Sequence, residues 1–432
     1  MPRHDRREPA RRSFLKLGTA FGLSLSAVLR RQSAGAPTKP SRATAQNMIL
    51  IWLGGGPATI DMWDMKPSAS SMIRGEFQPI STTLPGLQIC EHMPQLAKLM
   101  HKCTLIRSLK HAIPAHGPGS QYLITGNLPS AAVEYPSLGS VTAKMLDSLG
   151  GVPSYVTFGD PPSREAGYLG SAWNPFELDA SLPQLPEGIS LGADADLTAF
   201  QKRVRLRDLF DRQFDSRNAD RVASGIDAFQ QQAVDVLRQD TVRKALDIET
   251  VPDEVKQRYG TSTVGTNAIR ARRLIEAGAR FVTVGVDGWD THVNNFTQLR
   301  TNLLPQLDKA LAGLIFDLDR RGMLNETVVC CCGEFGRTPQ VNASAGRDHW
   351  SSAMSLLLAG GGFREGYVHG ATNPTGTEVS DSPLGPADLA ATILSRLGID
   401  PATHTQTSSG RTMPIVRNGR IVEDLLMPAH AT

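Results

Sequence analysis

The sequence lacks a large excess of either charge, because its 432 residues include 45 Lys and Arg and 42 Asp and Glu, for a net charge of +3. This balance hides an uneven distribution. Residues 1–45 contain ten basic and two acidic residues, a local charge of +8, so the other 387 residues carry a net charge of −5. A mildly acidic body does not supply the basic face that nucleic acids require. We therefore expect no nucleic-acid partner.

The sequence also lacks an apolar run that could form a permanent membrane span. The uncharged run at 17–29 is too short for this and contains two Gly and two Ser. It follows RRSFLK at 11–16, the twin-arginine pattern. We expect residues 1–45 to be a twin-arginine signal peptide, cleaved near 34–36 or 43–45, and the protein to reach the periplasm or cell surface through the twin-arginine export machinery. The alternative is a basic N-terminus with a chance pair of arginines.

Cysteine is scarce, and its spacing does not match a metal cluster. The five Cys are Cys90, Cys103 and the run Cys330, Cys331 and Cys332, with no paired CxxC motif of the kind that binds zinc. An oxidising compartment would permit a disulfide bridge. However, the three adjacent Cys lie in an apolar stretch at 327–332, where Cys behaves as a small hydrophobic residue. We therefore predict that they belong to the core.

Short apolar runs alternate with helical patterns along the rest of the chain. We predict buried strands at 47–53, 154–158, 280–286, 327–332 and 354–358, each closed by Gly or polar residues. Helices are predicted at 267–277 and 303–321, ending at Gly278 and Gly322. This alternation indicates the α/β class, with a mostly parallel central sheet and helices on both faces.

The chain contains no internal repeat, and one region differs from the rest in composition. Residues 195–260 are rich in Asp, Arg and Gln and poor in β-branched runs. We expect one domain at 46–425, with a mainly helical insertion near 160–260 that caps the site, and a tail at 426–432.

Polar side chains gather in the loops that follow the predicted strands. Ligands bind at the carboxyl edge of open α/β sheets, so these loops are expected to form one site. Imidazoles and carboxylates that meet from separate strands are the ligands of zinc, manganese or a similar divalent ion. The candidate metal ligands are Asp61, Asp64, Asp290, His292, Glu334, Asp348 and His349, and the candidate catalytic residues are His116, Ser120 and Arg337.

Each cluster also has a purely structural interpretation. Asp61 and Asp64 could cap the turn before Lys66, and His116 could bond backbone groups in a tight Gly-rich loop. The pair Asp290 and His292 is a short pattern that occurs by chance. The shared position after strands favours a site over these separate explanations.

Longer motifs connect the chain with a known family. The segments LGGGPATIDMWDMKP (53–67), HGPGSQYLITG (116–126), AGARFVTVGVDGWDTHVNNF (277–296) and GRDHWSSAMSLLLAGGG (346–362) resemble the large bacterial domain-of-unknown-function family 1501, whose members are exported by the twin-arginine route. The resemblance extends from about residue 47 to about residue 415. It implies an alkaline-phosphatase-like fold, shared with sulfatases, phosphatases and cofactor-independent phosphomutases, and gives the function only loosely.

The resemblance also implies roles for individual residues. Glu334 stands where sulfatases have a metal-binding Asp, and Phe335 replaces a usual second ligand. The motif GRDHW is similar to a phosphomutase motif that supplies a ligand His, which makes His349 the strongest candidate ligand. In the phosphomutases an Asp and His pair precedes that motif in the chain. Asp290 and His292 are similar to this pair, although the spacing between them is shorter.

The nucleophile position departs from the sulfatase pattern. Aligning Thr125 and Gly126 with the end of the sulfatase motif places His116 where sulfatases have the Cys that becomes formylglycine, so that mechanism is excluded. Ser120 would be displaced by about one helical turn. Three alternatives remain: His116 attacks covalently, His116 binds a metal that activates water, or the site has lost activity. A phosphomutase would require a phosphoenzyme on His116 or Ser120.

The sequence thus predicts an exported metal-dependent hydrolase of an anionic ester, with a sulfate or phosphate ester of a small molecule or glycan as substrate. The cofactor would be one or more divalent ions, with zinc, manganese or calcium as candidates. Arg337 or Arg347 would stabilise charge on the transferred or leaving oxygen, aided by a helix that begins just after 117–119. The alternative is a non-catalytic protein that binds an anionic glycan or joins a cell-surface assembly.

Overall fold

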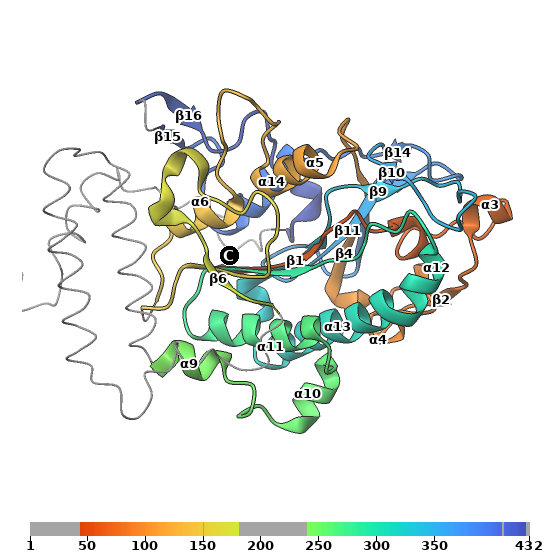
Figure 1. Ribbon diagram of the computed structural model, residues 1–432, viewed down its shortest axis with the longest axis horizontal. Helices are drawn as coiled ribbons and strands as arrows, with labels where there is room; N and C mark the ends of the chain where they lie inside the picture. The colour runs from red at the N-terminus through yellow and green to blue at the C-terminus, as the bar shows by residue number, and fades with distance from the viewer. Residues whose placement is uncertain (1–43, 150, 181–239, 408–409, 429–432) are drawn as a thin grey trace, which may run out of the picture. The chain divides into compact units, whose positions relative to one another are not determined.

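The computed structural model describes residues 44–149, 151–180, 240–407 and 410–428. All but the last two residues of the predicted signal peptide lie outside these ranges, as does 181–239 of the predicted insertion. The centre of the described chain is an eight-stranded sheet in the order β12-β4-β11-β8-β1-β7-β5-β6 (Figure 1).

The sheet is mostly parallel. Its strands are β1 (Asn47–Leu53), β4 (Cys103–Leu109), β5 (Tyr155–Phe158), β6 (Phe176–Leu178), β7 (Phe281–Val286), β8 (Thr327–Cys332), β11 (Met354–Ala359) and β12 (Tyr367–His369). Among these strands β11 is antiparallel to its neighbours β4 and β8, and the other neighbouring pairs are parallel. The predicted α/β class with a mostly parallel sheet is therefore confirmed.

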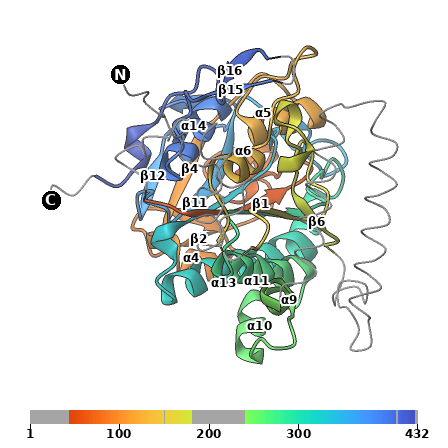
Figure 2. The ribbon, with the colours of Figure 1, turned by 90° about the vertical axis from the view of Figure 1, so that its left-hand side faces the viewer.

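Helices cover both faces of the sheet. Figures 1 and 2 show α5 (His116–Thr125), α6 (Leu138–Met145) and α14 (Pro386–Arg396) above it, and α4 (Pro94–Ala97), α11 (Thr263–Glu276) and α13 (Leu304–Arg320) below it. Strand β1 contributes alternate residues to the two cores, with Ile49 and Ile51 on one side and Leu50 and Trp52 on the other. Because helices cover both faces of the sheet, the sequence of β1 is a continuous apolar run.

The helix α13 shows why the pattern at 303–321 predicted a helix. Its buried residues Leu307, Leu311, Leu314 and Leu318 recur every three or four positions and face α11 and the sheet. Gly322 follows it with a φ of 70°, a backbone conformation that glycine adopts at helix ends. No helix formed by the described residues combines the length and apolar character that crossing a membrane requires.

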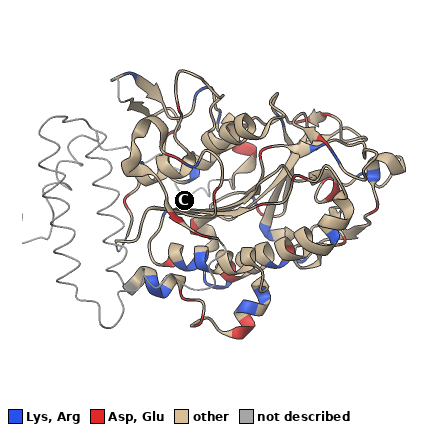
Figure 3. Ribbon diagram, viewed as in Figure 1, with Lys and Arg blue, Asp and Glu red and all other residues tan. Residues whose placement is uncertain are grey.

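Shorter elements complete the described chain. They are α3 (Ser71–Arg74), α9 (Asp240–Leu246), α10 (Asp253–Tyr259), α12 (Asn295–Gln298), β2 (Pro79–Ser81), β3 (Gln88–Cys90), β9 (Gly336–Arg337), β10 (His349–Trp350), β13 (Ala371–Thr372), β14 (Val379–Asp381), β15 (His404–Gln406) and β16 (Thr412–Pro414). Charged residues of both signs share the helices below the sheet (Figure 3). In α10 the acidic residues occupy the first turn and the basic residues the last, which complements the helix dipole.

Strands β4, β6 and β12 of the central sheet were not expected from the sequence. Strand β4 contains Arg107, which interrupts its apolar run, and this side chain donates to the carbonyl of Trp63 over 2.9 Å. Strand β6 lies within the predicted helical insertion yet pairs with β5 at the edge of the sheet. With only three residues, β6 leaves no recognisable pattern in the sequence.

The cysteine prediction is confirmed. Cys330, Cys331 and Cys332 form part of β8 and are at most 4% exposed. Cys90 and Cys103 are also buried, and all five thiols are free. Burial raises the pKa of the Cys90 thiol to about 12.

We predict that no thiol of the folded protein reacts with a thiol-specific reagent on a timescale of minutes, because all five thiols are buried. In denaturant, five thiols per chain should react, as measured by chromogenic titration. Rapid labelling of the folded protein, or fewer than five thiols after unfolding without a reductant, would contradict this account.

Candidate metal centre

The candidate site lies beyond the carboxyl ends of neighbouring parallel strands. The loops after β1, β7 and β8 pack directly on one another there. Gly55 has a φ of 115°, and a Cβ at this position would lie 2.4 Å from the backbone nitrogen of Asp290. Because only glycine has the space and the conformational freedom to occupy this position, the Gly-rich loop brings β1 against the Asp290 segment.

Three histidines meet at this edge from different elements. His116 is the first residue of α5, His292 follows β7, and His349 lies in β10. The Nδ1 atom of each faces an acceptor: Glu334 Oε1 at 2.7 Å from His116, Asp348 Oδ1 at 2.7 Å from His292, and the carbonyl of Pro114 at 3.0 Å from His349. A carboxylate or carbonyl only accepts, so when each Nδ1 donates its proton to these acceptors, the Nε2 lone pair is left for a cation.

These three lone pairs converge on Asp290. The Nε2 atoms of His292 and His349 lie 3.1 Å and 3.3 Å from Asp290 Oδ1 and 3.0 Å from each other. His116 Nε2 lies 3.4 Å from Asp290 Oδ2. Ligand atoms of His116, Asp290 and His349 all lie within 4.8 Å of one another.

The donor set fits a divalent cation. Lone pairs and a carboxylate this close repel one another unless positive charge lies between them, and spacings of about 3 Å suit ligands bonded at about 2.1 Å to one zinc ion. A further indication is Glu334 Oε2, which is buried and has no hydrogen-bond partner among the described residues. Such an atom normally has a partner in water or an ion.

Asp290 is held in its charged form. Desolvation raises its pKa, but the hydrogen bond and charge of Arg337 outweigh this and lower the pKa to about 2. The carboxylate is therefore ionised throughout the physiological range and available as a ligand.

Arg337 has a different position from the one predicted. Its side chain is fully buried rather than directed at substrate. Besides Asp290, its guanidinium group donates to backbone carbonyls of all three loops: those of Gly55, Gly56, Trp289 and Arg347. All three guanidinium nitrogens are bonded to internal partners, so Arg337 positions Asp290 and the loops rather than a substrate.

Asp61 and Asp64 do not join the histidine cluster. Asp61 is 1% exposed and accepts hydrogen bonds from Arg347, with its Oδ1 at 2.6 Å from Nη2 and its Oδ2 at 2.7 Å from Nε. Asp64 pairs with Lys66 at 2.9 Å and also accepts from the hydroxyl of Thr372. Their oxygens are committed to these partners, so the geometry departs from the predicted ligand roles. Arg347 is likewise committed and unavailable to a substrate.

Glu334 and Asp348 do reach the cluster, as partners of imidazoles. Glu334 Oε1 accepts from His116 and, over 3.0 Å, from the backbone N–H of Gly55. Asp348 accepts from His292, and this hydrogen bond lowers the Asp348 pKa. Phe335, which replaces a usual ligand, is buried with its ring centroid 5.1 Å from that of His116 and 4.5 Å from that of His349.

The two candidate nucleophiles differ in accessibility. Ser120 is 0% exposed within α5, so a substrate cannot reach its hydroxyl in this conformation. The side chain of His116 is 40% exposed. The helix also begins at His116 rather than after 117–119, because Gly119 already bonds back to the carbonyl of Ala115 over 2.8 Å.

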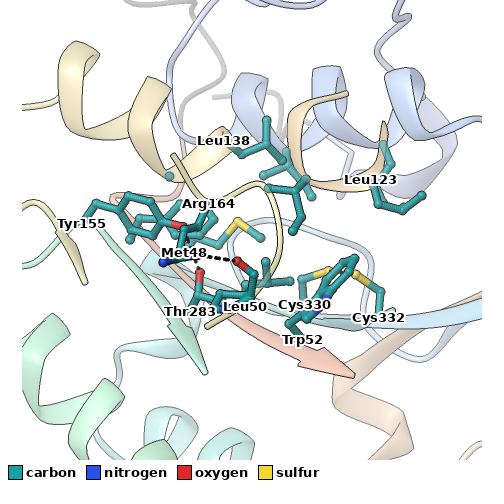
Figure 4. A pocket seen from close by; sticks show the side chains of 16 residues that line it. Met48, Leu50, Trp52, Leu123, Leu138, Tyr155, Arg164, Thr283, Cys330 and Cys332 are labelled. Carbon is teal, nitrogen blue, oxygen red and sulfur yellow. Dashed lines mark hydrogen bonds between the residues drawn. The ribbon is translucent and has the colours of Figure 1, made fainter. Parts of the chain in front are cut away.

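A separate cavity lies between the sheet and the helices above it. Figure 4 shows Leu50, Trp52, Leu138, Cys330 and other side chains that line it. Its volume of about 20 Å³ has room for little more than one water molecule, its lining is almost wholly apolar, and it contains none of the candidate site residues. It is therefore a packing defect of the core rather than the candidate site.

The sequence matches, over residues 45–426, a family model described as protein of unknown function, DUF1501. The chain belongs to the DUF1501 family. No curated protein matches its sequence.

Several solved structures are similar to this DUF1501 chain. The lipoteichoic acid synthase LtaP from Listeria monocytogenes is 12% identical with a TM-score of 0.37, over 89% of this chain and 78% of that one. The PsFucS1 sulfatase from Pseudoalteromonas sp. is 14% identical with a TM-score of 0.39, over 86% and 70%. A protein in the alkaline phosphatase superfamily from Vibrio parahaemolyticus is 10% identical with a TM-score of 0.38, over 86% and 74%.

Some contacts of the DUF1501 site have no signal in the sequence. The acceptor for His349 is the backbone carbonyl of Pro114, which any residue could supply. His111 lies with its Nε2 2.8 Å from the carbonyl oxygen of Glu334 and helps to hold the loop before α5.

We predict that Arg337→Lys lowers the free energy of unfolding by at least about 3 kcal/mol, because several buried carbonyls lose their donors at about 1–3 kcal/mol each. Urea denaturation measures this. Arg420→Lys is the matched control, since that side chain is 80% exposed and its change should stay within about 0.5 kcal/mol. Equal stability of the Arg337 variant and the wild type would contradict the role assigned to Arg337.

Proposed function

We propose that this protein is an exported metal-dependent hydrolase of an anionic ester, either a sulfate or a phosphate ester. The observation that carries the proposal is the convergence of three imidazole Nε2 atoms on the carboxylate of Asp290, with each Nδ1 held by an acceptor. Imidazoles fixed in this way by outer carboxylates and carbonyls are typical of metal sites.

The donor set favours zinc or manganese over calcium. His116, His292, His349 and Asp290 would hold the ion, and calcium prefers oxygen ligands alone. When bound, such an ion supplies charge neutralisation for the anionic ester group and lowers the pKa of a coordinated water molecule.

Two features beside the ion site would face the substrate: His116 and the N-terminus of α5. His116 is half-exposed and oriented by Glu334, so as a ligand it would hold the ion where a substrate can reach it, whereas Ser120 is buried. Gly117 follows it at the start of α5, and nothing lies within 4 Å of the position of a Cβ there. The N-terminal N–H groups of α5 could therefore donate hydrogen bonds to an ester oxyanion.

The proposal includes export. The pattern RRSFLK at 11–16 supports the twin-arginine route, which moves folded proteins and so allows a metal site to be filled before transport. The substrate would then be a small-molecule or glycan ester outside the cytoplasmic membrane.

Two observations favour the competing, non-catalytic function. The guanidinium groups of Arg337 and Arg347 are both committed to internal partners, and Ser120 is buried. A metal site without a reachable hydroxyl nucleophile could serve to bind an anionic glycan or a partner at the cell surface.

We predict that the mature protein binds zinc or manganese and that His349→Ala abolishes stoichiometric binding, because this change removes one of the converging nitrogens. Metal analysis after equilibrium dialysis measures binding. His404→Ala is the matched control, since His404 is exposed in β15, and it should bind as the wild type does. A metal-free wild type, or an unchanged His349 variant, would contradict the proposal.

The wild type and the His349→Ala variant also distinguish the hydrolase from the non-catalytic alternative. The metal-loaded wild type should hydrolyse at least one member of a panel of nitrophenyl phosphates, phosphodiesters and sulfates, and His349→Ala should not. Metal binding without hydrolysis of any panel member would favour the non-catalytic alternative. Phosphate trapped covalently on His116 would instead indicate a phosphoenzyme.

We predict that changing Arg11→Lys and Arg12→Lys together keeps the protein in the cytoplasm, because the twin-arginine receptor reads the arginine pair itself and lysine preserves only its charge. Cell fractionation and immunoblotting measure this. Replacing Arg6 and Arg7 with Lys is the control and should leave export intact. Normal export of the Arg11 and Arg12 variant would exclude the twin-arginine route.

A further inference from the structure

The buried carboxylate of Asp61 connects two of the three chain segments that carry the candidate metal ligands. Asp61 ends the short turn at Thr59–Asp61, after the Gly-rich loop of β1. Its Oδ1 and Oδ2 bind Arg347, and Oδ2 also accepts from Asn295 Nδ2 over 2.8 Å. One side chain thus holds two partners that belong to different segments of the site.

The first connection leads to the segment 290–292. Asn295 is 0% exposed, and its Oδ1 accepts from the hydroxyl of Thr291 over 2.6 Å. Thr291 is also fully buried and lies between Asp290 and His292. The chain of hydrogen bonds from Asp61 through Asn295 therefore ends on the residue between two of the converging ligands.

The second connection leads to the segment 347–349. Arg347 is fully buried, precedes Asp348 and His349, and donates through its backbone N–H to the carbonyl of Thr291 over 3.1 Å. Its guanidinium group also donates to the carbonyls of Thr338 at 3.0 Å and Ile73 at 2.9 Å. The two ligand segments are thus joined to each other as well as to Asp61.

The packing between these segments leaves no space for adjustment. Next to Arg347, a Cβ on Gly346 would lie only 1.8 Å from the carbonyl oxygen of His292. The two segments therefore keep their ligands at fixed separation only while the buried network between them is intact.

We propose that Asp61 is a positioning residue of the metal centre: without touching the ion, it fixes the separation of Asp290 and His292 from His349. This inference rests on the proposed function, because it presumes that these residues bind a cation. Removing a residue that orients metal ligands without binding the ion commonly changes metal affinity about 10–100-fold, because the orientation of the ligands is lost.

The test is zinc affinity, measured by competition with a chromophoric chelator on variants shown to be folded by circular dichroism. Asp61→Asn keeps the shape of the side chain and removes its charge, and it should weaken zinc binding about tenfold or more. The matched control is Asp308→Asn. Asp308 is also a buried carboxylate, but it accepts from the backbone N–H groups of Gln95 and Leu96 in α4. This control should lower stability and leave zinc affinity unchanged.

A milder pair of variants applies if Asp61→Asn does not fold. Thr291→Val removes only the hydroxyl that joins the network and should also weaken zinc binding, whereas Thr291→Ser keeps the hydroxyl and should restore wild-type affinity. Unchanged affinity in Asp61→Asn or Thr291→Val, or an equal loss in Asp308→Asn, would overturn the inference while leaving the proposed function intact. A wild type that binds neither zinc nor manganese would overturn both.

Discussion

The contact between Arg337 and Asp290 is the interaction on which the site depends. The guanidinium group donates to buried carbonyls in the loops after β1, β7 and β9 and to the carboxylate of Asp290. A buried cation of this kind is stable only when it is paired and hydrogen-bonded. In turn, Arg337 keeps Asp290 ionised and fixed in the middle of three imidazoles. The loops and the candidate ligands are therefore held by the same contact.

The position of His349 beside the other candidate ligands depends on the antiparallel direction of β11. Strand β8 ends at the carboxyl edge of the sheet, the chain crosses that edge through β9 and β10, and β11 then returns in the opposite direction. His349 precedes β11 and therefore lies at the same edge as Asp290 and His292. If β11 were parallel to β8, the segment before it would begin at the opposite edge, far from the other ligands.

The sequence predicted the buried elements well and the polar contacts less well. Strands at 47–53 and 327–332 were placed to the residue, because strands covered on both faces are continuously apolar. Strand β4 was missed because Arg107 interrupts its pattern. Asp290 and His292 could be selected because they follow a predicted strand, and His116 and His349 because their motifs resemble those of sulfatases and phosphomutases. By contrast, Asp61 and Arg337 could not be separated from true ligands or catalytic groups, since their partners are distant in sequence or are backbone carbonyls.

The central claim is that imidazole nitrogens and the Asp290 carboxylate form a divalent metal site, and X-ray absorption spectroscopy of the zinc-loaded mature protein tests it most directly. The account predicts a first shell of nitrogen and oxygen at about 2.0–2.1 Å with outer scattering from more than one imidazole. Because all five cysteines are buried and none belongs to the candidate site, no sulfur should appear at about 2.3 Å. A sulfur shell, or a spectrum without imidazole scattering, would contradict the account.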